Sequence, residues 1–474
     1  MGERKYNLLE ANRILSMKIP MAWVRTLAAS FILLFGSDAS TQELEFPISP
    51  SPVGSGARAA GMADAFVAIA DDATAASWNP AGLVQLERPE FSVVGSFNAL
   101  REDFDALGHP EFLSEHTDSN VDLNFMSFVY PLPTLPTGRN ASVSLSYQRK
   151  YDFSRSFETD FLTSFQIGSL VADQLQTIQY DQEGGLSAIT GTLAVELTRR
   201  LSIGVAINFW RDSFLGSNGW SQTTDEFALT SIGDNEPTVT ERSLTESYRN
   251  FRAENYVIGI LWNFSEGWNL GVRYDTGFTG TTKFRSDSSS FETVNEKRRV
   301  EFPATLALGL SRRVNDRLTF SVDFSFTKWE KFRVTREDGS QFSLIDASDP
   351  RDTDSPSNFD PTITVRLGVE YLFIDRIQRE RMDYLWSLRG GLFYDQEPAS
   401  GESLGDGNGT SGEPDDFYGI AGGIGLLVHG SLNLDLAYQL RYGPNVNADF
   451  FRGVDGFNED VTQHRVLVSA VLYF

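Results

Sequence analysis

Charged side chains occupy some of the alternate, non-apolar positions inside several apolar runs of the sequence. Because successive side chains of a β-strand point to opposite faces, these charged residues share the face turned away from the apolar one. Arginine binds carboxylates through two parallel hydrogen bonds, so Arg366 and Arg389 are candidates to receive a ligand carboxylate. The alternative for the whole set is a structural one, ion pairs that hold together a wet interior. The set contains Arg273, Asp275, Asp323, Arg366, Glu370, Arg389, Asp435 and Arg441.

The residue types needed for catalysis or metal binding do not form a recognisable pattern. The chain has no cysteine and only four histidines, which are isolated from one another, so the sequence offers neither a thiolate site nor a His-x-x-x-His pair. A Gly-x-Ser-x-Gly match at 401–405 lies in a Gly- and Asp-rich stretch, without the strand-to-helix turn that exposes a nucleophile. We therefore expect no enzyme activity, no metal and no cofactor.

Alternation of apolar and polar residues predicts the elements that must position these side chains. In one example, the apolar residues Leu318, Phe320, Val322 and Phe324 alternate with polar neighbours. Fourteen runs of this kind predict strands at 91–98, 122–131, 140–149, 185–197, 201–211, 252–263, 268–277, 299–311, 317–328, 361–373, 384–395, 416–428, 431–442 and 463–474.

The connections between these predicted strands alternate in length. The long ones are 99–121, 150–184, 212–251, 278–298, 329–360, 396–415 and 443–462, and the short ones are 132–139, 198–200, 264–267, 312–316, 374–383 and 429–430. An even number of strands, with long loops on one side and short turns on the other, is typical of a transmembrane β-barrel. We therefore predict an all-β fold, a 14-stranded antiparallel barrel that crosses a membrane.

The composition agrees with a barrel in which only alternate residues meet lipid. The chain of 474 residues contains 36 Phe, 15 Tyr and 8 Trp, yet its mean hydropathy is -0.24. Its net charge of -24 argues against a nucleic acid partner. Acidic loops would lie at the height of lipopolysaccharide phosphates, where divalent cations can bridge the like charges, so we expect outer-membrane lipid and lipopolysaccharide as partners. Solubility is an equally good reason for the acidic loops.

Both ends of the chain carry patterns typical of export and membrane assembly. Lys18 and Arg25 precede the apolar run 27–35, and a small-x-small site ends at Ala39. Residues 1–39 are therefore predicted to be a signal peptide, with room for an upstream extension. The last nine residues alternate as a strand and end on Phe474. Because a barrel closes only when its last strand pairs with its first, we expect Phe474 to be needed for assembly by the barrel assembly machinery.

Residues 40–90 do not alternate, and they are rich in Ala and Gly, which favours short helices packed in a confined space. Asn79-Pro80 predicts a turn, because proline lacks a backbone donor and restricts the residue before it. Phe66 and Trp78 are candidates to line an apolar ligand pocket, and simple packing is the alternative for both.

Two pieces of this segment resemble a known family. They are 59–73 (AAGMADAFVAIADDA) and 78–83 (WNPAGL), which are similar to the N-terminal hatch of the FadL/TodX family of outer-membrane transporters for long-chain fatty acids and other hydrophobic compounds. The resemblance implies a hatch at 40–90 that plugs the lumen of a barrel formed by 91–474. It assigns the family's Asn-Pro-Ala element to Asn79, Pro80 and Ala81.

One departure from the family concerns the third predicted strand. In the member best known for fatty acid uptake, a kink in this strand opens the barrel wall. The run 141–147 contains no Gly or Pro that would make such a bulge. The sequence therefore leaves open whether the wall has a lateral opening.

These observations support two hypotheses about function. The first is a channel-type transporter, a monomer in the bacterial outer membrane that moves long-chain fatty acids or other hydrophobic compounds inward by passive diffusion past the hatch. Burial of apolar ligand surface would drive binding at about 25 cal/mol per Å². The second is a protein-interaction or secretion accessory component with the same barrel. A continuous apolar tunnel favours the first, and a sealed lumen with a protein-binding surface favours the second.

Overall fold

The computed structural model describes residues 55–106, 114–133, 138–167, 170–213, 215–232, 236–342, 359–374, 383–399, 413–446 and 457–474. The predicted signal peptide, residues 1–39, and the Gly-x-Ser-x-Gly match at 401–405 lie outside these ranges. Within the described ranges, no helix is long and apolar enough to cross a membrane.

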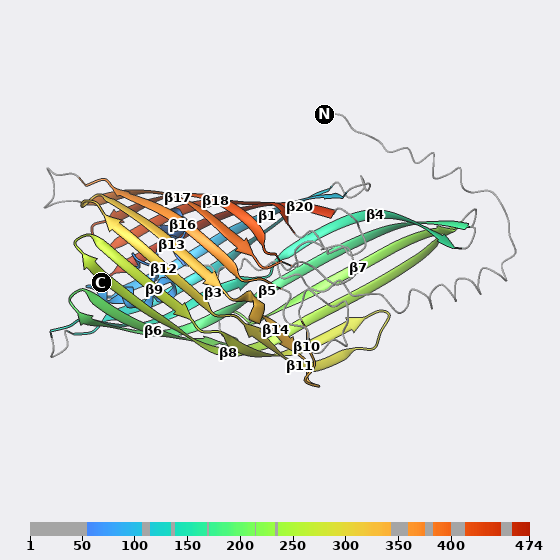
Figure 1. Ribbon diagram of the computed structural model, residues 1–474, viewed down its shortest axis with the longest axis horizontal. Coiled ribbons are helices and arrows are strands. Elements are labelled where there is room, and N and C mark those ends of the chain that lie inside the picture. Colours follow the sequence, from blue (N-terminus) through green and yellow to red (C-terminus); the bar gives the residue numbers. More distant parts are fainter. Residues whose placement is uncertain are drawn as a thin grey trace, which may run out of the picture.

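Fourteen strands form a closed antiparallel barrel, as predicted (Figure 1). Each strand pairs with its neighbours around the wall, and the last strand pairs with the first, from Glu90↔Tyr473 to Ala106↔Phe457. Two of the strands, β5 and β8, contribute only their C-terminal parts to the wall. In order the strands are β1 (Glu90–Ala106), β2 (Ser114–Pro131), β3 (Ala141–Asp152), β5 (Leu170–Thr198), β6 (Leu201–Trp210), β8 (Thr238–Ser265), β9 (Trp268–Asp275), β12 (Thr305–Arg313), β13 (Leu318–Thr327), β16 (Thr362–Leu372), β17 (Tyr384–Glu397), β18 (Asp415–Val428), β19 (Leu432–Val446) and β20 (Phe457–Tyr473).

The wall has the alternation that the sequence predicts. On β13, Phe320, Val322 and Phe324 are exposed on the outside, whereas Ser321 and Asp323 are buried toward the lumen. Large exposed apolar side chains recur in this way on the other strands of the wall. The outer surface is therefore built to face lipid, as in a bacterial outer-membrane barrel.

Several strands continue beyond one end of the barrel, where β4, β5, β7 and β8 run on together (Figure 1). We call this part the extension. Its strands pair in the order β4-β5-β7-β8-β10-β11-β14-β15. Besides the N-terminal parts of β5 and β8, it contains β4 (Arg155–Ile167), β7 (Gly219–Ile232), β10 (Phe278–Ser288), β11 (Val294–Phe302), β14 (Arg333–Thr335) and β15 (Gln341–Phe342).

The extension corrects two predictions. The segments 150–184, 212–251 and 278–298 are largely strands and not loops. The prediction was wrong because alternation in hydropathy is weak where neither face of a sheet meets lipid. The predicted strand 299–311 is in fact two strands, β11 in the extension and β12 in the wall. They are separated at Pro303, which has no N–H to donate to the ladder.

Aromatic side chains fill the junction between barrel and extension. The ring of Phe278 stacks on Trp210 at 5.2 Å and on Phe302 at 5.0 Å between centroids. These rings belong to one buried cluster drawn from both parts, which anchors the extension on the wall. The cluster includes Tyr151, Phe153, Trp210, Trp220, Tyr248, Phe251, Phe284, Phe302, Trp329, Phe332 and Phe359. Trp329 belongs to the short 3-10 helix η4 (Trp329–Lys331).

The hatch occupies the lumen with short helical turns, as predicted. Its described part, residues 55–89, contains α2 (Ala57–Gly61), α3 (Ala75–Trp78) and the 3-10 helix η2 (Pro80–Gln85). Most of these residues are buried. The small side chains allow the turns to pack tightly on one another in the confined lumen.

Glycines of the wall let the hatch backbone touch the strands. A Cβ atom at Gly204 would lie 2.3 Å from the carbonyl carbon of Pro80, and one at Gly259 would lie 2.2 Å from Asn79 Oδ1. Since neither distance is sterically allowed, any side chain at these positions would push the hatch away from the wall. The same close approach occurs at Gly271, Gly309, Gly368, Gly391 and Gly423.

We expect charge to be tolerated poorly on the lipid face of the wall. Val322→Arg should destabilise the barrel by about 2–4 kcal/mol if the residue lies near the midplane of the bilayer. Ser325→Arg, on the opposite face of the same strand, should cost less. Urea unfolding in lipid vesicles measures both, and equal losses for the two variants would contradict the orientation of the wall.

We also expect Phe474 to be needed for assembly. Its backbone N–H donates to the carbonyl of Pro89 at 3.0 Å, directly beside the β20–β1 pairing that closes the barrel. Deleting Phe474 should therefore reduce the heat-modifiable, folded form in outer-membrane fractions on gels. Phe474→Tyr keeps the terminal ring and is the control. Normal assembly of the truncated chain would remove Phe474 from the assembly signal.

Candidate functional site

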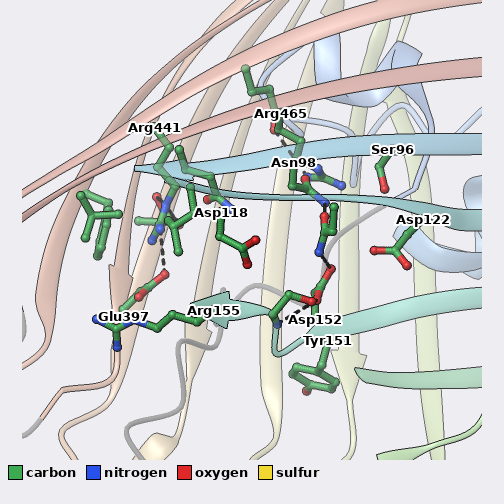
Figure 2. A pocket seen from close by; sticks show the side chains of 18 of the residues that line it. Ser96, Asn98, Asp118, Asp122, Tyr151, Asp152, Arg155, Glu397, Arg441 and Arg465 are labelled. Carbon is green, nitrogen blue, oxygen red and sulfur yellow. Dashed lines mark hydrogen bonds and ion pairs between the residues drawn. The ribbon is translucent and has the colours of Figure 1, made fainter. Parts of the chain in front are cut away.

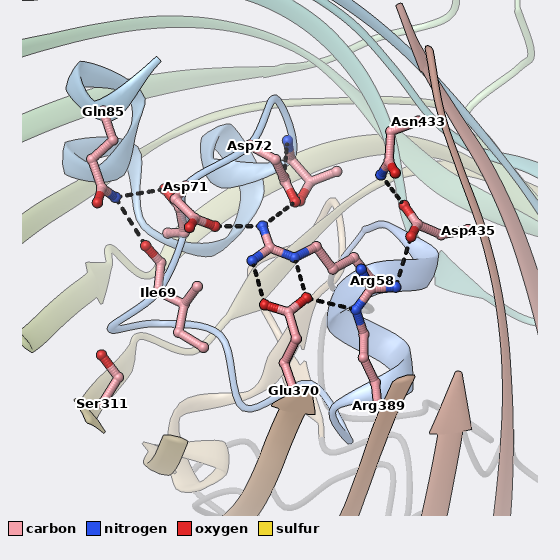
Figure 3. A network of polar contacts seen from close by, with 12 residues as sticks. Arg58, Ile69, Asp71, Asp72, Gln85, Ser311, Glu370, Arg389, Asn433 and Asp435 are labelled. Carbon is pink, nitrogen blue, oxygen red and sulfur yellow. Dashed lines mark hydrogen bonds and ion pairs between the residues drawn. The ribbon is translucent and has the colours of Figure 1, made fainter. Parts of the chain in front are cut away.

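A buried ion network joins the hatch to the wall (Figure 3). Arg58 of α2 donates from Nε to Glu370 Oε1 at 2.9 Å and from Nη2 to Glu370 Oε2 at 2.8 Å. Its Nη1 faces the carboxylates of Asp71 and Asp72 in the hatch. Because Glu370 lies on β16, this bidentate pair fixes α2 to the barrel.

The network continues into the wall through Arg389 of β17. Its Nε donates to Glu370 Oε1 at 2.8 Å, and its Nη1 donates to Asp435 Oδ1 at 2.7 Å. A ligand carboxylate would have to compete with these two buried pairs. The ligand role of Arg389 therefore stays a prediction, and the contacts seen here are structural ones.

Arg58 was not among the predicted site residues, although it is the only basic residue of the Ala- and Gly-rich segment 54–82. Burial works to lower the pKa of Arg58, but Asp71 and Glu370 outweigh this effect and hold that pKa well above its ordinary value. Burial raises the pKa of Asp72, against the lowering effect of Arg58. Arg58 is therefore a permanent positive charge at the centre of the hatch contact.

Asn79 connects the turn of the hatch to the wall. Its Nδ2 donates to the carbonyl of Val67 at 2.9 Å and to the carbonyl of Ile260 on β8 at 3.0 Å. Its Oδ1 accepts a hydrogen bond from the N–H of Ala81 at 3.2 Å. Pro80 takes the first position of η2, where its missing N–H is not needed. The Asn-Pro-Ala element thus holds both the turn and its contact with the wall.

A polar cavity, which we call the upper cavity, lies on the extension side of the hatch (Figure 2). Most charges around it are paired with one another. The pairs are Arg155 with Glu102 and Glu459, Arg441 with Asp395 and Glu397, and Arg149 with Asp122 and Asp152. Leu100, Phe393, Phe417 and Val461 add apolar surface to the same lining, which also includes Arg366 and Lys150.

Lys150 differs from the paired charges of the upper cavity. Its side chain is only 5% exposed. Among the described residues its ammonium makes no ion pair or hydrogen bond, and it faces the ring of Trp210 at 5.8 Å from the centroid. Lys150 is the extra residue of a β-bulge, since Arg149 and Tyr151 pair with consecutive residues of β5. The carboxylate of Asp275 acts on this ammonium electrostatically, but Asp275 is itself paired with Arg273, so a further anion beside Lys150 would be favourable.

The bulge lies beside an opening in the backbone pairing of the wall. Pairing between β2 and β3 ends at Phe125↔Gln148. Beyond this point β3 still pairs with β5 as far as Asp152, and β2 still pairs with β1 as far as Ser114. The run 141–147 is regular, as its lack of Gly and Pro predicts, and the irregularity begins just after it.

Polar side chains bridge this opening between β2 and β3. Asn120 Nδ2 donates to Asp152 Oδ2 at 2.6 Å, and Arg149 pairs with Asp122 at 3.4 Å. Side-chain contacts can part without breaking a backbone ladder. The gap between β2 and β3 is therefore closed by side chains and not by backbone hydrogen bonds.

The aromatic candidates lie inside the hatch. Phe66 and Trp78 meet edge to face at 6.2 Å between ring centroids, and both are buried in the hatch core. The guanidinium of Arg58 lies over the ring of Phe66 at 5.3 Å. Of the four residues predicted to contact ligand, Arg366 lines the upper cavity, whereas Phe66, Trp78 and Arg389 are held in packed contacts. Ligand contact by all four stays a prediction.

A lipid-facing barrel of fourteen strands, closed on itself and plugged by an N-terminal hatch, defines a class of bacterial outer-membrane transport proteins. A sequence model of the outer membrane protein transport proteins (OMPP1/FadL/TodX) matches residues 53–440. The chain belongs to this family, as the resemblance predicted. A comparison with curated protein sequences gives no match.

Solved structures of the family have the same fold. The crystal structure of a Pseudomonas aeruginosa FadL homologue is 15% identical, with a TM-score of 0.57, and the match covers 89% of this chain and 99% of that one. The toluene transporters TbuX of Ralstonia pickettii and TodX of Pseudomonas putida are each 14% identical, with TM-scores of 0.50, over 89% of this chain and 98% of theirs. At these identities the likeness shows the fold alone.

We expect the Asn79-Pro80 turn to control passage and not assembly. Replacing both residues with alanine removes the link to Ile260 and the fixed turn, without altering the wall. Membrane levels and heat-modifiability should stay normal, while uptake of hydrophobic compounds or leakage of small solutes changes in liposome-flux and whole-cell assays. Unchanged transport by a normally folded double variant would exclude the turn from the mechanism.

Proposed function

We propose that this protein moves hydrophobic compounds with an anionic head, such as long-chain fatty acids, inward across the outer membrane by passive diffusion. Membership of a transport family supports the hydrophobic class of substrate. The observation that carries the finer assignment is Lys150, a buried ammonium on the lining of the upper cavity that makes no ion pair with the described residues.

The upper cavity combines the two surfaces that such an amphipathic anion needs. A carboxylate at Lys150 would compensate the buried charge, which a neutral hydrocarbon cannot do. The apolar part of the ligand would lie on Leu100, Phe393, Phe417 and Val461 of the same lining. Burial of the chain would stabilise the complex by about 25 cal/mol per Å².

The gap between β2 and β3 offers a way out of the upper cavity. Lys150 stands at this gap, and the bridging pair of Arg149 and Asp122 has to part for a ligand to pass. An amphipathic ligand that leaves here would slide from the lumen toward the lipid. No energy source is required, because removal of the ligand on the inner side would keep the flux inward.

Three partners complete the proposal. We expect the barrel assembly machinery to insert the chain, and outer-membrane lipid and lipopolysaccharide to surround it. A single chain suffices, since the barrel closes on itself without a second copy.

The alternative role, a protein-interaction or secretion accessory component, is favoured by one feature of the extension. Leu162, Leu175, Leu229 and Val239 are directly paired across four neighbouring strands. Leu162, Leu175 and Val239 are 47%, 41% and 52% exposed. An exposed apolar row on a part that faces water suits contact with another protein.

The role of Lys150 predicts a difference between charged and neutral ligands. Lys150→Met keeps the length of the side chain and removes the charge, so binding of a long-chain fatty acid should weaken roughly 10- to 100-fold, the equivalent of a charge-assisted hydrogen bond. Binding of the alcohol with the same chain length should hardly change. Titration of the purified protein in detergent with both ligands measures this difference.

Two control variants make the result specific. Lys150→Arg should retain binding of the acid, and Lys283→Met removes an exposed lysine of the extension and should have no effect. Equal losses for the acid and the alcohol would overturn the role of Lys150 as an anion receptor. Absence of uptake of either ligand by the unaltered protein in proteoliposomes would favour the interaction role.

A further inference from the structure

A stripe of hydroxyl groups follows the lumen face of β2, β3 and β5 where these strands pass the hatch. Ser127 pairs with Ser146 across β2 and β3, and Ser144 pairs with Thr192 across β3 and β5. The exposed fractions are 2%, 2%, 8% and 5% respectively, and Ser142, the next lumen-facing residue of β3, is 1% exposed. We call these five residues the hydroxyl stripe.

The hydroxyls of the stripe have no hydrogen-bond partner among the residues that the structure describes. Buried hydroxyl groups in proteins are nearly always bonded, because desolvating one without a partner is unfavourable. The hatch covers them with apolar contacts, since Val129 and Ala194 of the same wall belong to the hatch core. Contact between hatch and wall is therefore energetically poor along the stripe.

Elsewhere the hatch is tied to the wall by hydrogen bonds. Ser202 of β6 donates to the carbonyl of Ala81 at 3.0 Å, and Ser311 of β12 donates to the carbonyl of Ala68 at 3.1 Å. Further bonds reach β8, β13, β16 and β19. In the described part of the chain, none of the hydrogen bonds of the hatch ends on β2, β3 or β5. The hatch is thus attached on one side of the lumen and only packed on the other.

The stripe also joins two cavities. At one end of β3, Arg149 and Lys150 line the upper cavity. At the other end, Asn140 lines a second cavity on the far side of the hatch, together with Gln85 and Glu196. The lumen-facing residues of β3 between these ends are Ser142, Ser144 and Ser146, followed by Gln148. A polar path therefore runs along a single strand from one cavity to the other.

We propose that the hatch parts from the wall along the hydroxyl stripe, and that water and small polar solutes pass there between the two cavities. Water can satisfy the buried hydroxyls as soon as the hatch moves by the width of one molecule, while the bonds to β6 and β12 hold its other side in place. This path is separate from the exit proposed for hydrophobic ligands, and it does not require that those ligands are transported.

Single-cysteine variants test the proposal, because the chain has no cysteine of its own. Ser127→Cys, Ser144→Cys and Ser146→Cys place a thiol on the stripe. Ser321→Cys on β13 and Ser469→Cys on β20 are matched controls, since these serines also face the lumen, are 2% and 3% exposed, and line neither of the two cavities. Each folded variant in proteoliposomes is treated with the membrane-impermeant thiol reagent MTSES, and its reaction rate is measured.

We expect at least two of the three stripe thiols to react at least tenfold faster than both control thiols. Any smaller difference overturns the proposal. Heat-modifiability shows that each variant is folded, and complete labelling after denaturation shows that each thiol is intact. A variant that does not fold is replaced by Ser142→Cys or Thr192→Cys, so that three stripe positions are always compared.

Blocking the stripe gives a second test. Modification of the Ser144→Cys thiol should reduce osmotic swelling of proteoliposomes in a small neutral sugar at least twofold, while binding of the fatty acid to the upper cavity is retained. Unchanged swelling after full modification overturns the passage of solutes along the stripe. Since swelling and fatty acid binding are measured separately, loss of one is distinguishable from loss of the other.

Discussion

A backbone in lipid has no water to bond with, so the wall of this barrel has to pair every strand with two neighbours and return the last strand to the first. The register of β20 with β1 satisfies this requirement along the full length of β1. Because the closed wall separates lipid from the lumen, every strand has an apolar outer face and a polar inner face. The polar faces line the lumen, where buried charges have to be paired and polar groups hydrogen-bonded. The hatch fills the rest of the lumen.

Compensation of charge is visible throughout the lumen. Glu370 lies between Arg58 of the hatch and Arg389 of the wall, and Arg389 reaches Asp435 as well. Breaking one such pair leaves a buried charge, which costs more than the pair itself contributes to stability. These networks therefore define where the hatch sits. The glycines of the wall complete the fit, because they allow the backbone of the hatch to approach closer than any side chain would permit.

Three departures from full compensation lie on the same side of the barrel. Pairing between β2 and β3 stops early, Lys150 is buried without an ion pair to the described residues, and the hydroxyl stripe faces apolar hatch residues. Proteins tend to keep such local conflicts where they function. The side formed by β1, β2, β3 and β5 is thus the one along which we propose that ligands and solutes move, and hydrogen bonds of the hatch lie on the other strands.

The sequence by itself determined the strands of the wall, because each meets lipid on one face and the period of two is read directly from residues such as Phe320, Val322 and Phe324. The resemblance to the FadL/TodX family assigned the hatch to the N-terminal segment. The strands of the extension escaped prediction because their two faces differ little in polarity. The pair of Arg58 and Glu370 also escaped prediction, since 312 residues separate the two and no local pattern joins them.

The tertiary structure alone decided which side chains of β3 and the following segment point inward. Before Lys150 the buried lumen-facing residues are Ser144, Ser146 and Gln148, whereas after the bulge they are Tyr151 and Phe153. One extra residue exchanges the two faces of a strand. Alternation in the sequence cannot reveal this exchange, because the bulge depends on the register with β5 and not on Gly or Pro in the strand itself.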